Sequence, residues 1–300
     1  MKKPKEFWYL NRPERFLAFD LQLYKLSTSI LEKMSAENTY LISPDGDSKA
    51  IVSDGELVNY IKVEEELIHQ KGEPGWRNSD TEMFPVIGPT KQNDFRVSTP
   101  RGECIQDQHG LLRELAYVLV NADANHTAFQ KKYSAGTPIK NSRYPEKSSE
   151  PEVFWPFDFE FRKEYELADD FLKILFHLES EKGMPFMFGY HPAFKLSGSR
   201  TESLQTRDGE QVSLDSVIEK GGKAHPLFNT EEIKLVKPVG YSVVVATHGF
   251  GNIMLWTEVP EMVCIEPITH YPSLDPRSEQ NLRISQGRED FSVLIKPVQE

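Results

Sequence analysis

The strongest constraint on the fold is an alternation of apolar and polar residues with a period of two. In "FDFEFRKEY", Phe157, Phe159 and Phe161 fall on one side of an extended chain, and charged residues fall on the other. Such alternation is typical of a strand with one face in the core and one in water. Similar runs, separated by turn residues, include "KAIVS", "ELVNYIKV", "FLKILFHLES", "YSVVVAT" and "FSVLIKPV". The sequence therefore predicts an all-β fold, an antiparallel sandwich or barrel.

The first 38 residues depart from this pattern. Between Leu21 and Met34 the apolar residues have a spacing that partly matches one face of a helix. We therefore expect residues 1–38 to form a partly helical N-terminal extension and residues 39–300 to form a single β domain.

Charge and cysteine usage exclude several classes of protein. The net charge of -11 makes an acidic surface, which would repel nucleic acid. The two cysteines have no metal-type spacing and favour a reducing compartment. The N-terminus lacks the apolar region of a signal peptide, and the longest apolar runs are too short to span a bilayer. We expect a soluble, cytoplasmic protein that binds neither nucleic acid nor membranes.

One histidine lies in a stiff, aromatic frame, "MPFMFGYHPAF". Gly189 permits a close approach or an unusual dihedral angle, and Pro192 biases His191 toward extended geometry. Such a frame could hold an imidazole at a pocket wall for proton transfer near neutral pH. The alternative is a hydrogen-bonded core histidine.

Two further segments carry candidate groups. His109 opens "HGLLR", in which Arg113 could orient a hydroxyl or an anion. Glu266 ends the apolar run "MVCIE", where desolvation would raise its pKa and make it a better base. The alternatives are a turn histidine, a surface arginine and a rim carboxylate. Two histidines and one glutamate could also bind a metal, but no H-E-x-x-H or H-x-H spacing is present, so we expect none.

These segments, in this order, resemble the aldose 1-epimerase (galactose mutarotase-like) family. The resemblance rests on "AIVSDGELVNYIKV", "GWRNSDTEMFPVIG", "HGLLREL", "MPFMFGYHPAF" and "NIMLWTEVPEMVCIEPIT", which extend from about residue 49 to the C-terminus. It implies a β-supersandwich. The H-G-x-x-R form is similar to that of mutarotase-like branches associated with the lactose operon or with hexose 6-phosphates.

The resemblance also implies an activity, the interconversion of the α and β anomers of an aldohexose by ring opening. It implies that Glu266 is the general base, that His191 is the general acid, and that His109 binds and polarises the sugar near its ring oxygen. Neither a cofactor nor a metal is needed for this chemistry. We expect a small-molecule sugar as the partner and a monomer or weak homodimer.

The chain departs from the family pattern at two positions. After "FPVIG", Pro89 and Thr90 stand where the family often has a sugar-binding arginine, and Lys91 is the possible substitute. Glu231 or Glu232 stands in place of the usual sugar-binding aspartate, and Trp76 could stack on a sugar face or belong to the core. Arg113 is the one basic residue in a matched motif that could bind a phosphate, so an unphosphorylated aldose is the simpler expectation.

Two alternatives remain open. The first is a non-catalytic carbohydrate-binding protein on the same fold, which the missing arginine favours. The second is a hexose-6-phosphate 1-epimerase. The presence of His109, His191 and Glu266 together favours an enzyme, because a pure binder needs no proton-transfer groups.

Overall fold

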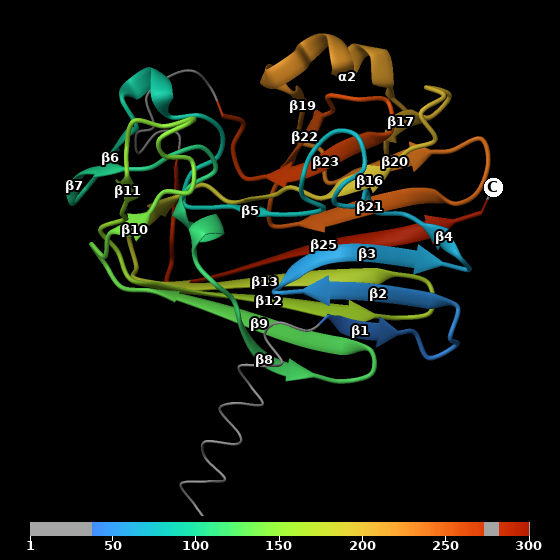
Figure 1. Ribbon diagram of the computed structural model, residues 1–300, viewed down its shortest axis with the longest axis horizontal. Coiled ribbons are helices and arrows are strands. Elements are labelled where there is room, and N and C mark those ends of the chain that lie inside the picture. The colour runs from blue at the N-terminus through green and yellow to red at the C-terminus, as the bar shows by residue number, and fades with distance from the viewer. Residues whose placement is uncertain (1–37, 273–281, 300) are drawn as a thin grey trace, which may run out of the picture. The chain divides into compact units, whose positions relative to one another are not determined.

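Figure 1 shows the computed structural model, which describes residues 38–272 and 282–299. Within these ranges the chain consists mostly of antiparallel strands arranged in layers. The prediction of an all-β fold is confirmed. The predicted N-terminal extension lies, apart from Asn38, outside the described residues.

The largest sheet has nine strands in the order β18-β17-β20-β21-β25-β13-β12-β9-β8. In that order their bounds are Gln211–Ser213, Ser203–Thr206, Glu232–Val236, Ser242–His248, Arg288–Val298, Leu172–Ser180, Phe159–Leu167, His126–Tyr133 and Val118–Ala122. Along β12, Phe159, Phe161, Tyr165 and Leu167 are buried. Glu160 is half-buried and Glu166 is exposed. The period-two pattern therefore gives this sheet one core face and one outer face.

The second large sheet carries the candidate site. Five of its strands follow the order β19-β22-β23-β15-β5, and β16 also pairs with β23. Their bounds are His225–Phe228, Asn252–Trp256, Met262–Ile268, Gly189–Tyr190, Glu82–Met83 and, for β16, Ala193–Lys195. Every residue of β23 is buried, as expected for a strand covered on both faces.

Smaller elements complete the described part of the chain. A four-stranded sheet packs on the nine-stranded one and has the order β1-β2-β3-β4, with bounds Thr39–Ile42, Ser48–Ser53, Glu56–Lys62 and Glu65–Glu66. Three two-stranded sheets are β6 with β7 (Arg96–Thr99, Gly102–Ile105), β10 with β11 (Ile139–Lys140, Glu152–Val153) and β14 with β24 (Pro185–Phe186, Arg283–Ile284). The helical segments are α2 (Leu214–Lys220) and the 3₁₀ turns η1 (Lys91–Asn93), η2 (Leu111–Glu114) and η3 (Gly221–Lys223).

An aromatic cluster joins the two large sheets. Phe188, just before β15, lies with its ring centroid 5.4 Å from that of Phe161 on β12 and 5.2 Å from that of Phe176 on β13. Each such side chain contributes about 1.5–3 kcal/mol when fully buried. This packing fixes the position of β15, and with it the strand that leads to His191.

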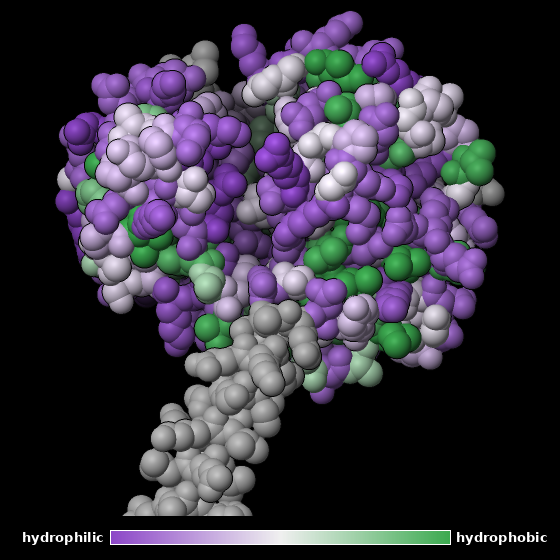
Figure 2. Space-filling model, in the orientation of Figure 1, coloured by the Kyte–Doolittle hydropathy of each residue, from purple (hydrophilic) through white to green (hydrophobic). Residues whose placement is uncertain are grey.

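The face of the molecule seen in Figure 2 is mostly polar, with apolar side chains scattered over it. The surface is hollowed between the part over β6, β7, β10 and β11 and the part over α2. Within the described ranges, the helices are all too short or too polar to cross a lipid bilayer.

Candidate functional site

The centre of the candidate site is a contact between an imidazole and a carboxylate. Nε2 of His191 lies 3.4 Å from Oε1 of Glu266. His191 is 5% exposed and Glu266 is 1% exposed. The other polar atoms of the two side chains, Nδ1 of His191 and Oε2 of Glu266, are buried without a hydrogen-bond partner. Unsatisfied buried polar atoms are costly, and a ligand bound here could supply the missing bonds.

The alternation of side chains along β15 explains why His191 faces the site. Phe188 and Tyr190 both pack against Phe176 in the core. His191, one residue on, points to the opposite face. Gly189, on the same face as His191, is closely packed, because a Cβ there would lie 2.5 Å from the end of the Met83 side chain, which would have to shift. Gly189 is therefore needed for close packing rather than for an unusual dihedral angle.

Strand β23 places Glu266 opposite this histidine. Glu266 pairs in register with Met254 of β22, and Cys264, two residues earlier, pairs with Trp256. Residues two apart share a face of a strand, so Cys264, Glu266 and Trp256 all face the site. The Trp256 ring is edge-on to His191, with centroids 6.0 Å apart.

Burial keeps both central groups uncharged. Desolvation raises the pKa of Glu266 well above its ordinary value. Desolvation, together with the nearby charge of Arg113, lowers the pKa of His191 to about 3. Because the two shifts are opposite in direction, the pair holds one proton over a wide pH range.

His109 lies beside His191, with ring centroids 5.8 Å apart. Its Nδ1 accepts a hydrogen bond from the backbone N–H of Gly88 at 3.3 Å, so in the neutral ring Nε2 carries the proton. Nε2 lies 3.2 Å from the amide nitrogen of Gln108, which is also a donor, so the Gln108 amide must turn its oxygen toward Nε2 when Nε2 carries the proton. Burial lowers the pKa of His109 well below its ordinary value, and the charges of neighbouring groups lower it further.

The backbone around His109 is strained. His109 has φ of 67°, a left-handed conformation that is uncommon for residues other than glycine. Gly110 follows with φ of 74°, and a Cβ there would lie 2.2 Å from the carbonyl oxygen of Phe84. That oxygen accepts a bond from the Leu112 N–H, and Phe84 N–H donates to the His109 carbonyl. Strain of this kind is typical of functional sites.

Two arginines adjoin the histidines. Arg113, in η2, lowers the pKa of both His109 and His191 through its charge. Arg143, in the loop after β10, lowers the pKa of His109 and of Arg113 in the same way. Its Nε lies 3.3 Å from Oδ1 of Asp107. Arg143 is not part of any motif in the sequence, and a position 34 residues after His109 gave no signal that it belongs here.

Trp76 lies against His191 in a stacked arrangement. The ring centroids are 4.2 Å apart and the planes are inclined by 27°. The backbone carbonyl of Trp76 lies 2.8 Å from Nε2 of the buried His69. Trp76 is half-buried, so its ring holds the imidazole and still meets solvent.

Lys91 and Glu231 do not join this group. Lys91 is exposed in η1, and Glu231 is exposed just before β20. Among the described residues, no hydrogen bond or ion pair connects either side chain to His191, His109 or Glu266. Their role in binding a sugar stays a prediction.

A buried charged cluster supports the strand next to His191. Nζ of Lys163 donates to Oδ2 of Asp80 at 2.8 Å and to Oε1 of Glu82 at 2.6 Å. Between these two acids, Thr81 exchanges backbone hydrogen bonds with His191. Lys163 lies two residues after Phe161, on the core face of β12. The alternating pattern of the sequence therefore already predicts that its side chain points inward.

The donor set at the centre could also hold a metal ion. Donor atoms of His191, Cys264 and Glu266 all lie within 4.8 Å of one another and are buried. Nitrogen, thiolate and carboxylate ligands are those that Zn²⁺ prefers. Burial raises the pKa of Cys264 well above its ordinary value, with a smaller contribution from Glu266, which disfavours the thiolate that a metal needs.

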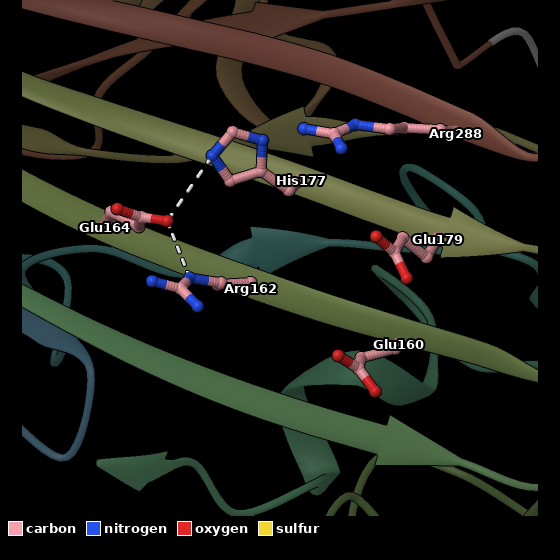
Figure 3. Close-up of a pocket in the computed structure, with 6 residues that line it drawn as sticks. All are labelled: Glu160, Arg162, Glu164, His177, Glu179 and Arg288. Atoms are coloured by element: carbon pink, nitrogen blue, oxygen red, sulfur yellow. Dashed lines mark ion pairs between the residues drawn. The ribbon is translucent and has the colours of Figure 1, made fainter. Parts of the chain in front are cut away.

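A separate polar pocket lies on the outer face of the nine-stranded sheet. Figure 3 shows its side chains on β12, β13 and β25, namely Glu160, Arg162, Glu164, His177, Glu179 and Arg288. Oε1 of Glu164 lies 2.6 Å from Nε of Arg162 and 3.5 Å from Nε2 of His177. The charged groups of this pocket are thus largely paired with one another, and they come from neighbouring strands of one sheet.

A family comparison and one curated relative each match about half of the chain. The model of the aldose 1-epimerase family matches residues 96–258, which is more than half of the 300 residues. Protein LacX of Lactococcus lactis subsp. lactis is 25% identical over 169 residues. That match covers 52% of this chain and 52% of LacX, so it spans about half the length of each.

Solved structures show the same fold. A galactose mutarotase-related enzyme from Lactobacillus acidophilus has a TM-score of 0.69 at 18% identity, covering 88% of this chain and 98% of that one. A galactose mutarotase-like protein from Lactobacillus casei has a TM-score of 0.70 at 17% identity, covering 87% and 100%. The prediction of a β-supersandwich of the galactose mutarotase type is confirmed.

Proposed function

The chain belongs to the aldose 1-epimerase family, and from that premise we propose that it interconverts the α and β anomers of an aldohexose. The observation that carries the proposal is the 3.4 Å contact between Nε2 of His191 and Oε1 of Glu266. Each of these side chains has a further buried polar atom without a partner, which a sugar hydroxyl or ring oxygen could bond.

In the proposed reaction, Glu266 removes the proton from the anomeric hydroxyl while His191 donates a proton to the ring oxygen. The bond between C1 and the ring oxygen breaks, and C1 becomes an aldehyde carbon. Rotation about C1–C2 presents the other face of the carbonyl, and closure by the reverse proton transfers gives the other anomer. No net proton is gained or lost, so no cofactor is required. His109 would donate from Nε2 to the sugar near the ring oxygen.

The shared proton of the central pair supports this scheme. A protonated Glu266 with a neutral His191 contains the same number of protons as an ionised Glu266 with a protonated His191. The first form is favoured without ligand, because burial penalises both charges. Sugar hydroxyls that donate to the Glu266 carboxylate would favour the second form, which is ready for the reaction.

The alternative is a protein on this fold that binds a sugar without converting it. One observation favours it. Thr90 is buried and its hydroxyl donates to the carbonyl oxygen of Gln106 at 2.6 Å, so it cannot replace the expected sugar-binding arginine.

The test follows the optical rotation or NMR signals of fresh α-glucose and α-galactose with the full chain added. We expect anomer interconversion faster than in buffer, and Glu266→Gln or His191→Ala to lower the rate by about 10²- to 10⁴-fold. Glu258→Gln is the matched control, because Glu258 is exposed close to Glu266 in sequence. If the wild-type rate equals that of buffer for a broad panel of sugars, the chain is not an epimerase.

A further inference from the structure

We propose that Trp76 is a positioning residue of the epimerase reaction, which holds the His191 ring in place and stabilises its protonated form through the face of the indole. This role rests on the function proposed above and assigns Trp76 to the histidine rather than to the sugar. The contact that carries it is a stack of the two rings, with centroids 4.2 Å apart and planes inclined by 27°.

The indole covers one face of the imidazole and is itself packed against the site. Trp76 contacts the small buried cluster of Ala193, Met262 and Cys264, and it is half-buried. His191 is 5% exposed, so its ring is surrounded by protein rather than by water. A change at Trp76 therefore acts directly on the environment of the imidazole.

The other aromatic neighbours of His191 meet it edge-on. His109 is inclined to the ring by 79° and Trp256 by 70°, with centroids 5.8 Å and 6.0 Å away. Among the described residues, Trp76 is thus the one aromatic side chain stacked on His191. The torsion that turns an imidazole about its side-chain bond is intrinsically broad. A stacked indole restricts this rotation and keeps Nε2 directed at Glu266, 3.4 Å away.

The stack also distinguishes the two protonation states of His191. A cation within about 6 Å of the centroid of a tryptophan ring is attracted by the negative face of that ring, and a neutral imidazole is attracted much less. The proposed reaction uses the form in which His191 is protonated and Glu266 is ionised. An interaction that favours this form lowers the barrier of the reaction without binding the sugar more tightly.

The protonated ring is subject to several charges besides the indole. The titratable and charged groups around His191 are Glu266 and Cys264 on β23, His109, and Arg113 in η2. An ionised Glu266 favours the imidazolium, and the charge of Arg113 opposes it. Trp76 adds a favourable contribution that does not depend on its own titration, because indole is not ionisable at these pH values.

The backbone of Trp76 is fastened on both sides. Its carbonyl oxygen lies 2.8 Å from Nε2 of His69. Because a carbonyl only accepts, Nε2 of His69 carries a proton and donates it. The N–H of Trp76 donates to Sδ of Met262 at 3.4 Å, and Met262 begins β23, the strand that carries Glu266.

His69 connects the indole to the strand that follows His191. It is fully buried, and its backbone N–H donates to the carbonyl of Ala193 at 2.9 Å. Ala193 begins β16 and lies two residues after His191. Trp76 is therefore tied to both of the segments that supply the catalytic pair, as expected for a group that must keep a fixed distance from them.

The test replaces Trp76 of the full chain by tryptophans that carry one, two or three ring fluorines, introduced at this position alone. Each fluorine weakens the attraction of the ring face for a cation and nearly preserves its shape. We expect kcat for anomerisation to fall stepwise, by about three- to tenfold over the series, with KM changed by less than about twofold. The matched control is the same series at Trp155, which is buried in the core, and it should leave kcat unchanged.

Two results in an active wild type would overturn the role of Trp76 while leaving the epimerase function intact. The first is a kcat that does not change along the series. The second is a KM that rises while kcat stays constant, because that result would assign the indole to the sugar.

The link through His69 has its own variants. His69→Gln can still place an N–H donor near the Trp76 carbonyl, whereas His69→Leu cannot. We expect the leucine variant to lose kcat by about three- to tenfold with little change in KM, and the glutamine variant to keep most of the wild-type kcat. Equal losses of kcat in the two variants would argue against the hydrogen bond as the link.

The stabilisation of the imidazolium can be measured even if no sugar is converted. The pKa of His191 is lowered to about 3, so between pH 4 and 5 its protonated fraction is small and proportional to its proton affinity. We expect ¹⁵N NMR of the imidazole to show that trifluorotryptophan at position 76 lowers this fraction by about three- to tenfold. Equal fractions in the two proteins would overturn the proposal whether or not the chain is an epimerase.

Discussion

Nε2 of His191 and Oε1 of Glu266 lie 3.4 Å apart, although the two residues are 75 positions apart in the sequence. Both side chains are buried, and burial acts on their pKa values in opposite directions. The pair therefore forms a unit that holds one dissociable proton at pH values between these two pKa values.

The pH dependence of the reaction follows from this unit. The one-proton form is lost when pH falls below about 3, where His191 also becomes protonated, and when pH rises through the raised pKa of Glu266. We expect kcat/KM to stay constant near pH 4.5, where an ordinary carboxylate titrates, and to fall when the pH rises through the raised pKa of Glu266. Anomerisation rates between pH 4 and 10 measure this. A profile that instead rises through neutral pH and stays high would contradict the shared proton.

Glu266→Gln should stabilise the protein at neutral pH. The folded-state pKa of Glu266 lies above its unfolded value, so the folded protein holds a proton that the unfolded chain releases as pH rises. Below pH 4.5 the unfolding free energy of the glutamine variant is not raised by this effect. Above pH 4.5 the difference from the wild type grows by about 1.4 kcal/mol per pH unit until the folded-state pKa of Glu266 is reached. Urea denaturation at pH 4, 6 and 8 tests this, and a difference that does not change with pH would argue against a buried, protonated Glu266.

Removing the buried lysine should be severe. Lys163 is fully buried between Asp80 and Glu82, and Lys163→Met leaves Asp80 without its cation and Glu82 with only the longer contact to Lys131 at 3.8 Å. Breaking such a group costs about 3–5 kcal/mol of unfolding free energy. The matched control is Lys132→Met on β9, because the Lys132 side chain is 71% exposed and its pair with Glu160 is worth at most about 1 kcal/mol. Similar losses in the two variants would show that the buried cluster is not specially stabilising.

Alanine at Gly110 should cost more than alanine at Gly102. Both glycines have positive φ, 74° and 103°, and a substitution at either introduces backbone strain of about 1–3 kcal/mol. At Gly102 the added Cβ meets open space, but at Gly110 it would lie 2.2 Å from the Phe84 carbonyl. Thermal unfolding compares the two, and Gly110→Ala should also slow anomerisation because His109 is displaced. Equal stability losses would mean that the Phe84 contact relaxes freely.

Much of the fold follows from local pattern. The period-two runs predict the strands around residues 159–167 and 172–180, because alternation reports which side chains face the core. Strand β9, with the sequence "HTAFQKKY", was not predicted, because its polar residues interrupt the alternation. The short helix α2 was missed as well, because seven residues give too little helical period to detect.

The sequence by itself determined which candidate group would be conformationally restricted and which would be shielded from water. Gly189 and Pro192 frame His191, and the apolar run before Glu266 predicts its desolvation. The tertiary structure decided which groups meet. Sheet pairing sets β15 beside β23, and the packing of the loop that carries Trp76 stacks its ring on His191. The physical reason is that periodicity reports the face of a strand and not its partner, because partners are chosen by packing between segments distant in the chain.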